Sequence, residues 1–156
     1  MAGMPPLKAR YAHTNLVARD WRRLARFYEE VFGCVPVPPE RNARGAWADR
    51  VTGLQDVHVR GMHLRLPGGG DAGPTLEIFE YAAPAEAPPP AVNRPGFAHL
   101  AFEVEDVDAA REKVHAAGGR DYAERVSVDI PGAGTITLIY VADPEGNILE
   151  LQKWSS

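Results

Sequence analysis

The sequence predicts an α+β protein made of two tandem βαβββ modules, each with a strand, a helix and three antiparallel strands. Three observations lead to this prediction. The halves of the chain repeat the same landmarks, a proline-rich segment separates them, and a turn near the C-terminus joins two apolar segments. An internal repeat usually means two copies of one supersecondary unit. We expect a first module over 1–83, a linker over 84–95 and a second module over 96–156.

The turn near the C-terminus has the sequence Asp-Pro-Glu-Gly-Asn, over residues 143–147. Proline presets φ for a turn, glycine supplies a positive φ, and asparagine tolerates the left-handed region. The apolar segments on both sides indicate a hairpin, whose second strand we expect over 147–154. On that strand Glu150 shares a face with Ile148 and Gln152. A carboxylate held among apolar residues needs a partner, a proton or a metal.

The first half is expected to begin with a strand over 12–18 and a helix behind it. Asp20 is a good N-cap, apolar residues follow at helical spacing, and Gly33 fits the position just beyond the helix. The other strands of this half are expected over 35–37, 45–52, 59–66 and 75–81. Two prolines should end the first of these four strands.

The second half repeats the first after a segment that contains five prolines over 82–95, a composition typical of a stiff, extended linker. We expect a strand over 97–104 and then a helix. Three landmarks recur at one constant offset: His13, Asp20 and Gly33 correspond to His99, Asp106 and Gly119. The segment around Glu77 matches the segment around Glu150 at a shorter offset, which is consistent with the longer loops of the first half.

Each half therefore carries one histidine on its first strand and one glutamate on its last strand. If the modules pair about a pseudo-twofold axis, four side chains can converge: His13, Glu77, His99 and Glu150. Two imidazoles and two carboxylates suit a divalent metal and leave room for exchangeable water. The repeat thus predicts a metal site between the two modules.

Composition restricts the class of function. The chain has 156 residues, a formal net charge of −4 and no long basic block, which argues against a nucleic-acid partner. No apolar run approaches the roughly 18 residues that span a bilayer. The first ten residues contain no apolar signal core, so we expect a cytoplasmic protein without a membrane partner. The single Cys34 excludes an internal disulfide and a cysteine-based zinc site.

The chain resembles the vicinal oxygen chelate superfamily, which includes glyoxalase, methylmalonyl-CoA epimerase, extradiol dioxygenases and the bleomycin- and fosfomycin-resistance proteins. The resemblance covers residues 9–154, and the turn over 143–147 followed by Ile-Leu-Glu-Leu is its most specific part. It implies a curved, cup-like mixed sheet around one divalent metal, which could be nickel, zinc, cobalt, manganese or iron. The ligands that it implies are His13, Glu77, His99 and Glu150, a set similar to that of bacterial-type glyoxalase.

The resemblance also implies an enzyme whose metal chelates two neighbouring oxygens of a small organic substrate. A glyoxalase-like lyase, isomerase or epimerase would pass through a metal-stabilised enediolate. Glu150 is the preferred base, Glu77 is the alternative base, and Tyr140 could brace Glu150. An extradiol-type dioxygenase is a second possibility, although its signature requires a histidine near 131–133, where the sequence reads Pro-Gly-Ala. A small-molecule-binding protein of the antibiotic-resistance type, without catalysis, is the third.

The substrate is poorly encoded in the sequence. Four large apolar residues could line a pocket: Trp47, Met62, Phe79 and Phe97. The arginines at 44, 50, 60 and 65 could meet an anion but are interpreted as a solvated strand face. His58 and His63 are interpreted as surface or strand histidines. The modules can pair within one chain or between two chains, and the resemblance implies a homodimer.

Overall fold

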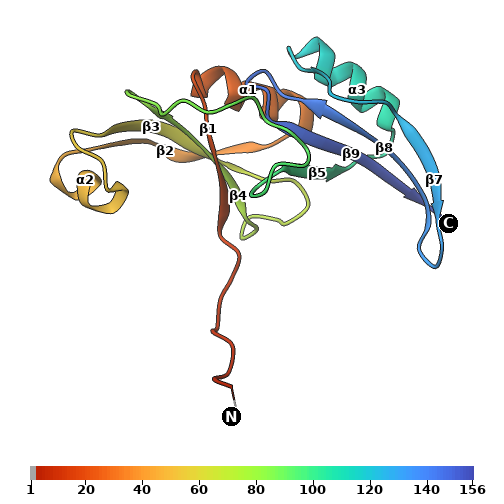
Figure 1. Ribbon diagram of the computed structural model, residues 1–156, viewed down its shortest axis with the longest axis horizontal. Coiled ribbons are helices and arrows are strands. Elements are labelled where there is room, and N and C mark those ends of the chain that lie inside the picture. The colour runs from red at the N-terminus through yellow and green to blue at the C-terminus, as the bar shows by residue number, and fades with distance from the viewer. Residues whose placement is uncertain (1–2) are drawn as a thin grey trace.

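The computed structural model describes residues 3–156 and contains two mixed sheets (Figure 1). The first sheet has the order β1-β4-β3-β2 and comprises β1 (His13–Val17), β2 (Val35–Arg44), β3 (His58–Arg65) and β4 (Thr75–Tyr81). The second has the order β5-β9-β8-β6 and comprises β5 (His99–Glu103), β6 (Arg120–Asp121), β8 (Gly134–Ala142) and β9 (Ile148–Ser155), with β7 (Val126–Ile130) paired to β8. The helices are α1 (Trp21–Phe32), α2 (Ala46–Thr52) and α3 (Val107–Ala116). The predicted α+β fold is confirmed.

Both long helices begin where the sequence predicts, and α1 also ends at the predicted glycine. The Asp20 side chain accepts a hydrogen bond from the backbone N–H of Arg23, and Asp106 caps α3 by accepting one from Ala109. Gly33 ends α1 with a φ of 68°, in the left-handed region where a residue without Cβ is unstrained.

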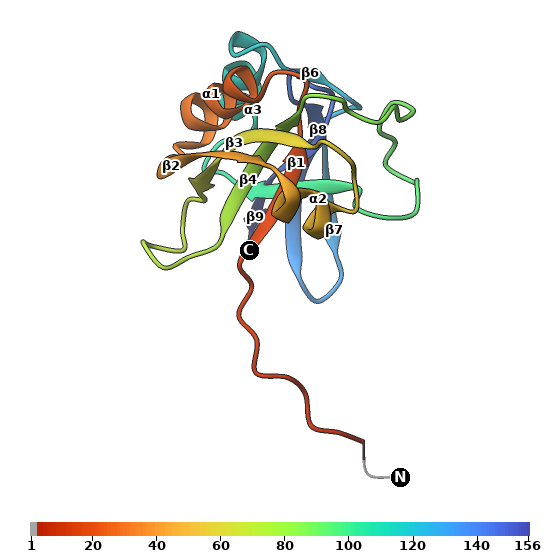
Figure 2. The same cartoon turned by 90° about the vertical axis from the view of Figure 1, so that its left-hand side faces the viewer.

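Helices α1 and α3 lie side by side on the same side of the two sheets (Figures 1 and 2). The main core fills the space between these helices and the sheets, and it draws buried residues from both halves of the chain. Across the middle, the Phe32 ring stacks on Phe102 with centroids 3.9 Å apart. In each sheet the first strand pairs in parallel with the last. The sheet faces that point away from α1 and α3 are not covered by these two helices.

The expected end of the second strand at its prolines was wrong. Strand β2 continues to Arg44, and its register with β3 shifts between Val37 and Arg41. Proline is tolerated there because β2 is an edge strand and the shifted segment needs no ladder hydrogen bond. The extra residues bring Arg41 opposite Gly61.

The strand expected over 45–52 was also wrong, because this segment forms helix α2. Glycines flank it, with φ of 91° at Gly45 and 72° at Gly53. Ala48 is buried in a small second core with Val57 and Val59, and this packing outweighs the weak local pattern. Val59 lies on the opposite face of β3 from the main core, so α2 packs on the sheet face that α1 leaves free.

The turn over 143–147 is tied to α1 by a buried carboxylate. Asp143 is fully buried and accepts hydrogen bonds from the Tyr28 hydroxyl at 2.8 Å and the Asn147 side-chain amide at 2.8 Å. It also accepts the backbone N–H groups of Glu145 and Asn147 at 2.9 and 3.0 Å. Burial raises the pKa of Asp143, while these hydrogen bonds act in the opposite direction. The network fixes the start of β9 against the first half.

Among the helices that the structure describes, none combines the length and the apolar character that a membrane crossing requires.

Candidate metal centre

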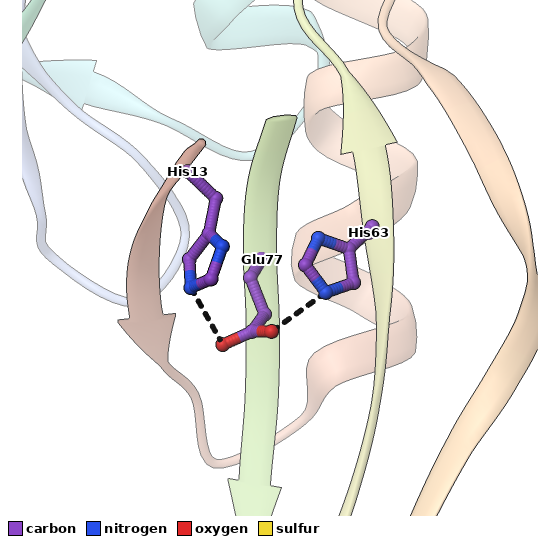
Figure 3. A group of neighbouring side chains, drawn as sticks. All are labelled: His13, His63 and Glu77. Carbon is purple, nitrogen blue, oxygen red and sulfur yellow. Dashed lines mark ion pairs between the residues drawn. The ribbon is translucent and has the colours of Figure 1, made fainter. Parts of the chain in front are cut away.

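Two histidines and one glutamate meet on the face of the first sheet that points away from α1 (Figure 3). His13 is the first residue of β1, Glu77 is central in β4, and His63 on β3 lies directly opposite Glu77 in the antiparallel register. One carboxylate oxygen of Glu77 lies 3.5 Å from His13 Nε2, and the other lies 2.6 Å from His63 Nε2. The carboxylate therefore bridges the two imidazoles.

Neighbouring side chains hold the cluster in place. The Asn15 side-chain amide donates to Glu77 at 2.9 Å, and His63 Nδ1 lies 2.7 Å from the hydroxyl of buried Thr75. A proton on Nδ1, donated to Thr75, leaves His63 Nε2 free as a ligand. Burial is the main cause that lowers the pKa of His63, helped by the charges of Arg41 and His13 against the opposing effect of Glu77. A lowered pKa favours the neutral imidazole that binds metals.

The donor set fits a divalent transition metal. One ligand atom from each of the three residues lies within 4.8 Å of the others. Two imidazole nitrogens and one carboxylate suit zinc, nickel, cobalt, manganese and ferrous iron, and three protein ligands leave open positions for water or substrate. Within residues 3–156, no other group of three or more histidine, cysteine or acidic side chains meets this condition.

The second sheet carries an equivalent but different arrangement. His99 Nε2 on β5 lies 3.1 Å from Glu150 on β9. Tyr140 on β8 lies opposite Glu150, as His63 lies opposite Glu77, and its ring centroid is 5.0 Å from that of His99. The repeat therefore places a histidine–glutamate pair in each half, with an imidazole beside the first pair and a phenol beside the second.

The four ligands expected from the sequence lie in two separate pairs, one in each sheet. Within residues 3–156 they do not form one four-membered cluster. The two histidines nevertheless line one cavity of about 860 Å³ between the leading strands β1 and β5. Tyr11 and Phe97, which occupy equivalent positions of the repeat, also line it and are strongly exposed. The cavity is therefore lined by one expected ligand from each half of the chain, the histidine of its first strand.

The four residues expected to line a pocket do not come together. Phe97 lines the cavity between β1 and β5. Met62 packs against the main core on the α1 side, and Phe79 packs with the small core beneath α2. Trp47 lies on α2 and is 58% exposed.

His63 is the functional candidate that the sequence interpretation missed. Its interpretation as a surface or strand histidine used only its own strand, on which nothing distinguishes it. The missing information is the register of β3 against β4, which places His63 directly opposite Glu77. Aligning the two halves strand by strand would have indicated His63, because it then corresponds to Tyr140, which the sequence already places beside Glu150.

A Thr75→Val variant is expected to weaken divalent metal binding roughly 10–100-fold, the usual effect of losing an outer partner of a ligand. Valine keeps the shape but removes the hydroxyl that fixes the His63 ring. Titration of the metal-free protein with cobalt, followed by absorption, measures the change. Thr135→Val on β8 is the matched control, since that threonine bonds Asp129 far from the cluster, and its affinity should be unchanged. Equal affinities of all three proteins would contradict the assigned role of Thr75.

The fold and the cluster define a class: a duplicated βαβββ protein with imidazole and carboxylate side chains on the open faces of its sheets. The family model described as the Glyoxalase/Bleomycin resistance protein/Dioxygenase superfamily matches residues 10–151, and the chain belongs to this family. The family resemblance in the sequence is thereby confirmed.

Two curated relatives illustrate the range of the family. A 2-epi-5-epi-valiolone epimerase from Actinomyces sp is 34% identical over 146 residues, which cover 89% of this chain and 76% of the epimerase. A putative glyoxylase CFP32 from Mycobacterium bovis is 36% identical over 111 residues, which cover 69% of this chain. The aligned region spans only 38% of the length of that glyoxylase.

Solved structures agree with the fold. A glyoxalase family protein from Bacillus cereus superposes with a TM-score of 0.77 at 23% identity, covering 100% of this chain and 99% of that one. The fosfomycin resistance protein FosX from Listeria monocytogenes, in complex with Mn(II) and sulfate, gives a TM-score of 0.52 at 16% identity, covering 96% and 95%. At these identities the similarity concerns the fold alone.

Proposed function

We propose that the protein is a divalent-metal-dependent enzyme that acts on a small organic substrate with two neighbouring oxygens, as a glyoxalase-like lyase or isomerase or as an epimerase. The observation that carries this proposal is the cluster of His13, His63 and Glu77, whose ligand atoms are already grouped and supported. Membership of a family that includes a similar epimerase supports the same class of chemistry.

In this proposal His13, His63 and Glu77 hold the metal. The bound cation would supply Lewis acidity, which makes a C–H bond next to the chelated oxygens more acidic. Glu150 would accept that proton. Its carboxylate pairs with one imidazole, whereas the carboxylate of Glu77 bridges two imidazoles, so Glu150 has more free capacity to bind a proton. His99 and Tyr140 would orient the Glu150 carboxylate, since both lie beside it.

We further propose that a homodimer brings the two histidine–glutamate pairs together. Strands β1 and β5 each lie at the edge of a sheet, and the cavity between them is bordered by the exposed rings of Tyr11 and Phe97. Exposed apolar groups beside an incomplete site favour association with a second copy. We also propose that the chain is divided into one module over 1–83, a linker over 84–95 and a second module over 96–156.

A second candidate, an iron-dependent oxygenase, has one observation in its favour. Two histidines and one carboxylate with open positions are also the ligand set of non-haem ferrous oxygenases. It predicts retention of iron and oxygen consumption with catechols. The two candidates differ in metal and co-substrate, so one set of measurements separates them.

Metal analysis tests the centre itself. Purified protein is expected to contain about one divalent ion per chain, and His63→Ala to lose at least tenfold in affinity as one ligand disappears. His58→Ala is the matched control, because His58 lies on the same strand but bonds Asn42 and is outside the cluster. Elemental analysis and a competitive chelator assay measure both quantities. Equal affinities of the His63 variant and the wild-type protein would contradict the proposed ligand set.

The reaction is tested with a substrate panel on the metal-loaded protein. Turnover of a 2-oxoaldehyde thiohemiacetal, an acyl-CoA thioester or a 2-epimerisable hydroxyketone supports the proposal. Turnover of catechols with oxygen consumption supports the oxygenase instead. Metal uptake without turnover of any of them would support a binding protein.

A further inference from the structure

The open face of the first sheet carries unbalanced positive charge beside the metal centre. Alternation along β2 and β3 puts Arg41 and Arg65 on the same face as His63. Neither arginine makes a salt bridge with an acidic residue within residues 3–156. Their guanidinium groups donate to the backbone carbonyls of Pro39 and Gly73, and these bonds leave each side chain with free donors.

Arg41 lies beside the stretch of β3 that runs from the metal centre towards the small core under α2. It pairs with Gly61, which is two residues from His63 on the same face of β3. Gly61 has no side chain, and the ring of Phe79 covers it, 2.7 Å from where a Cβ would stand. Because Phe79 is two residues from Glu77 on β4, its ring lies between the metal centre and the small core under α2. A substrate chelated at the centre could extend over this ring towards Arg41.

The charge balance of this face favours an anion. On the strand positions that share the face, Glu77 is the one acidic residue, and two imidazoles already contact it. A divalent cation would add two positive charges to those of Arg41 and Arg65. Arginine presents a planar fork of donors that matches carboxylate and phosphoryl oxygens. A neutral substrate would leave this charge without a partner.

We propose that Arg41 is a specificity-determining residue that binds an oxyanion, a carboxylate or a phosphoryl group, on the substrate of the metal centre. This inference rests on the proposed function and narrows it to anionic substrates. In this arrangement the oxyanion of the substrate lies nearer to β2 than the two chelated oxygens do. The substrate carbons between these two ends lie over the ring of Phe79. Arg65 adds to the positive field and is not required to touch the substrate.

Hydroxamates test this inference, because they chelate metals through two neighbouring oxygens without turnover. The probes are neutral butyrohydroxamate, succinic monohydroxamate with a carboxylate, and 3-phosphonopropionohydroxamate with a phosphonate. Calorimetry on the nickel-loaded protein measures each dissociation constant. At least one anionic probe is expected to bind roughly tenfold tighter than the neutral one, as a hydrogen-bonded ion pair allows. Comparison of the carboxylate and the phosphonate identifies the preferred oxyanion.

The variant Arg41→Gln is expected to abolish the preference for the anionic probes, measured as the ratio of their affinities to that of butyrohydroxamate on the same nickel-loaded variant. Arg44→Gln is the matched control, since Arg44 is on the same strand but points to the other face and is exposed. It should keep the full preference. Equal binding of the neutral and anionic probes to the wild-type protein, or an unchanged preference in Arg41→Gln, would overturn the inference alone. No binding of butyrohydroxamate to the nickel-loaded protein would overturn the proposed function as well.

Discussion

A Glu77→Ala variant is expected to lose divalent metal binding almost completely, with a drop in affinity well beyond the roughly 100-fold limit for outer partners. Glu77 contacts both imidazoles of the cluster, at 3.5 Å and 2.6 Å. Its removal takes away a ligand and also the charge that compensates a bound cation. Two neutral imidazoles alone would hold the metal weakly. Equilibrium dialysis with nickel or cobalt measures the loss.

Glu150→Gln is the informative comparison, because it changes the equivalent residue of the other half. The carboxylate of Glu150 has one imidazole partner, His99, at 3.1 Å. Glu150 lies outside the cluster of His13, His63 and Glu77. If it transfers the proton, Glu150→Gln should retain the metal and lose turnover by at least about 100-fold. Strong metal loss in Glu150→Gln with unchanged affinity in Glu77→Ala would reverse the assigned roles. Equal metal loss in both variants would point instead to one four-ligand site shared across a dimer.

Local chemistry explains what the sequence could predict of this fold. Asp20 and Gly33 bound α1 through contacts within one turn of helix, so their effect is visible without the rest of the chain. The alternation of β9 works in the same way: Leu149 and Leu151 are buried in the core, and Glu150 points to the other face. These features depend on neighbours a few residues away.

The missed features depend on packing between distant segments. Helix α2 has a weak pattern of its own and is stabilised by Ala48 against Val59, which lies on β3 beyond the loop that follows α2. The role of His63 depends on the loop between β3 and β4, because the length of that loop sets the register opposite Glu77. Where the two histidine–glutamate pairs lie relative to each other depends on how the halves of the chain pack across Phe32 and Phe102. The spacing of apolar and polar residues along the sequence does not indicate these arrangements.

The largest loss of stability is expected from Asp143→Ala, which should lower the free energy of unfolding by about 3–5 kcal/mol. The carboxylate is fully buried and accepts four hydrogen bonds, which come from Tyr28, Glu145 and Asn147. Alanine would leave the Tyr28 hydroxyl and two backbone N–H groups without acceptors. Because Tyr28 lies on α1 in the first half and Asp143 precedes β9 in the second, the loss would also loosen the contact between the halves.

Urea unfolding of the metal-free protein measures this effect without a contribution from metal binding. Tyr28→Phe is the graded control, since it removes one of the four hydrogen bonds and should cost only about 1–2 kcal/mol. Phenylalanine keeps the ring that packs against Phe27, so the difference isolates the hydroxyl. A loss in Asp143→Ala no larger than that in Tyr28→Phe would mean that water replaces the carboxylate. The network would then not be what holds β9 and its Glu150 in register with the first half.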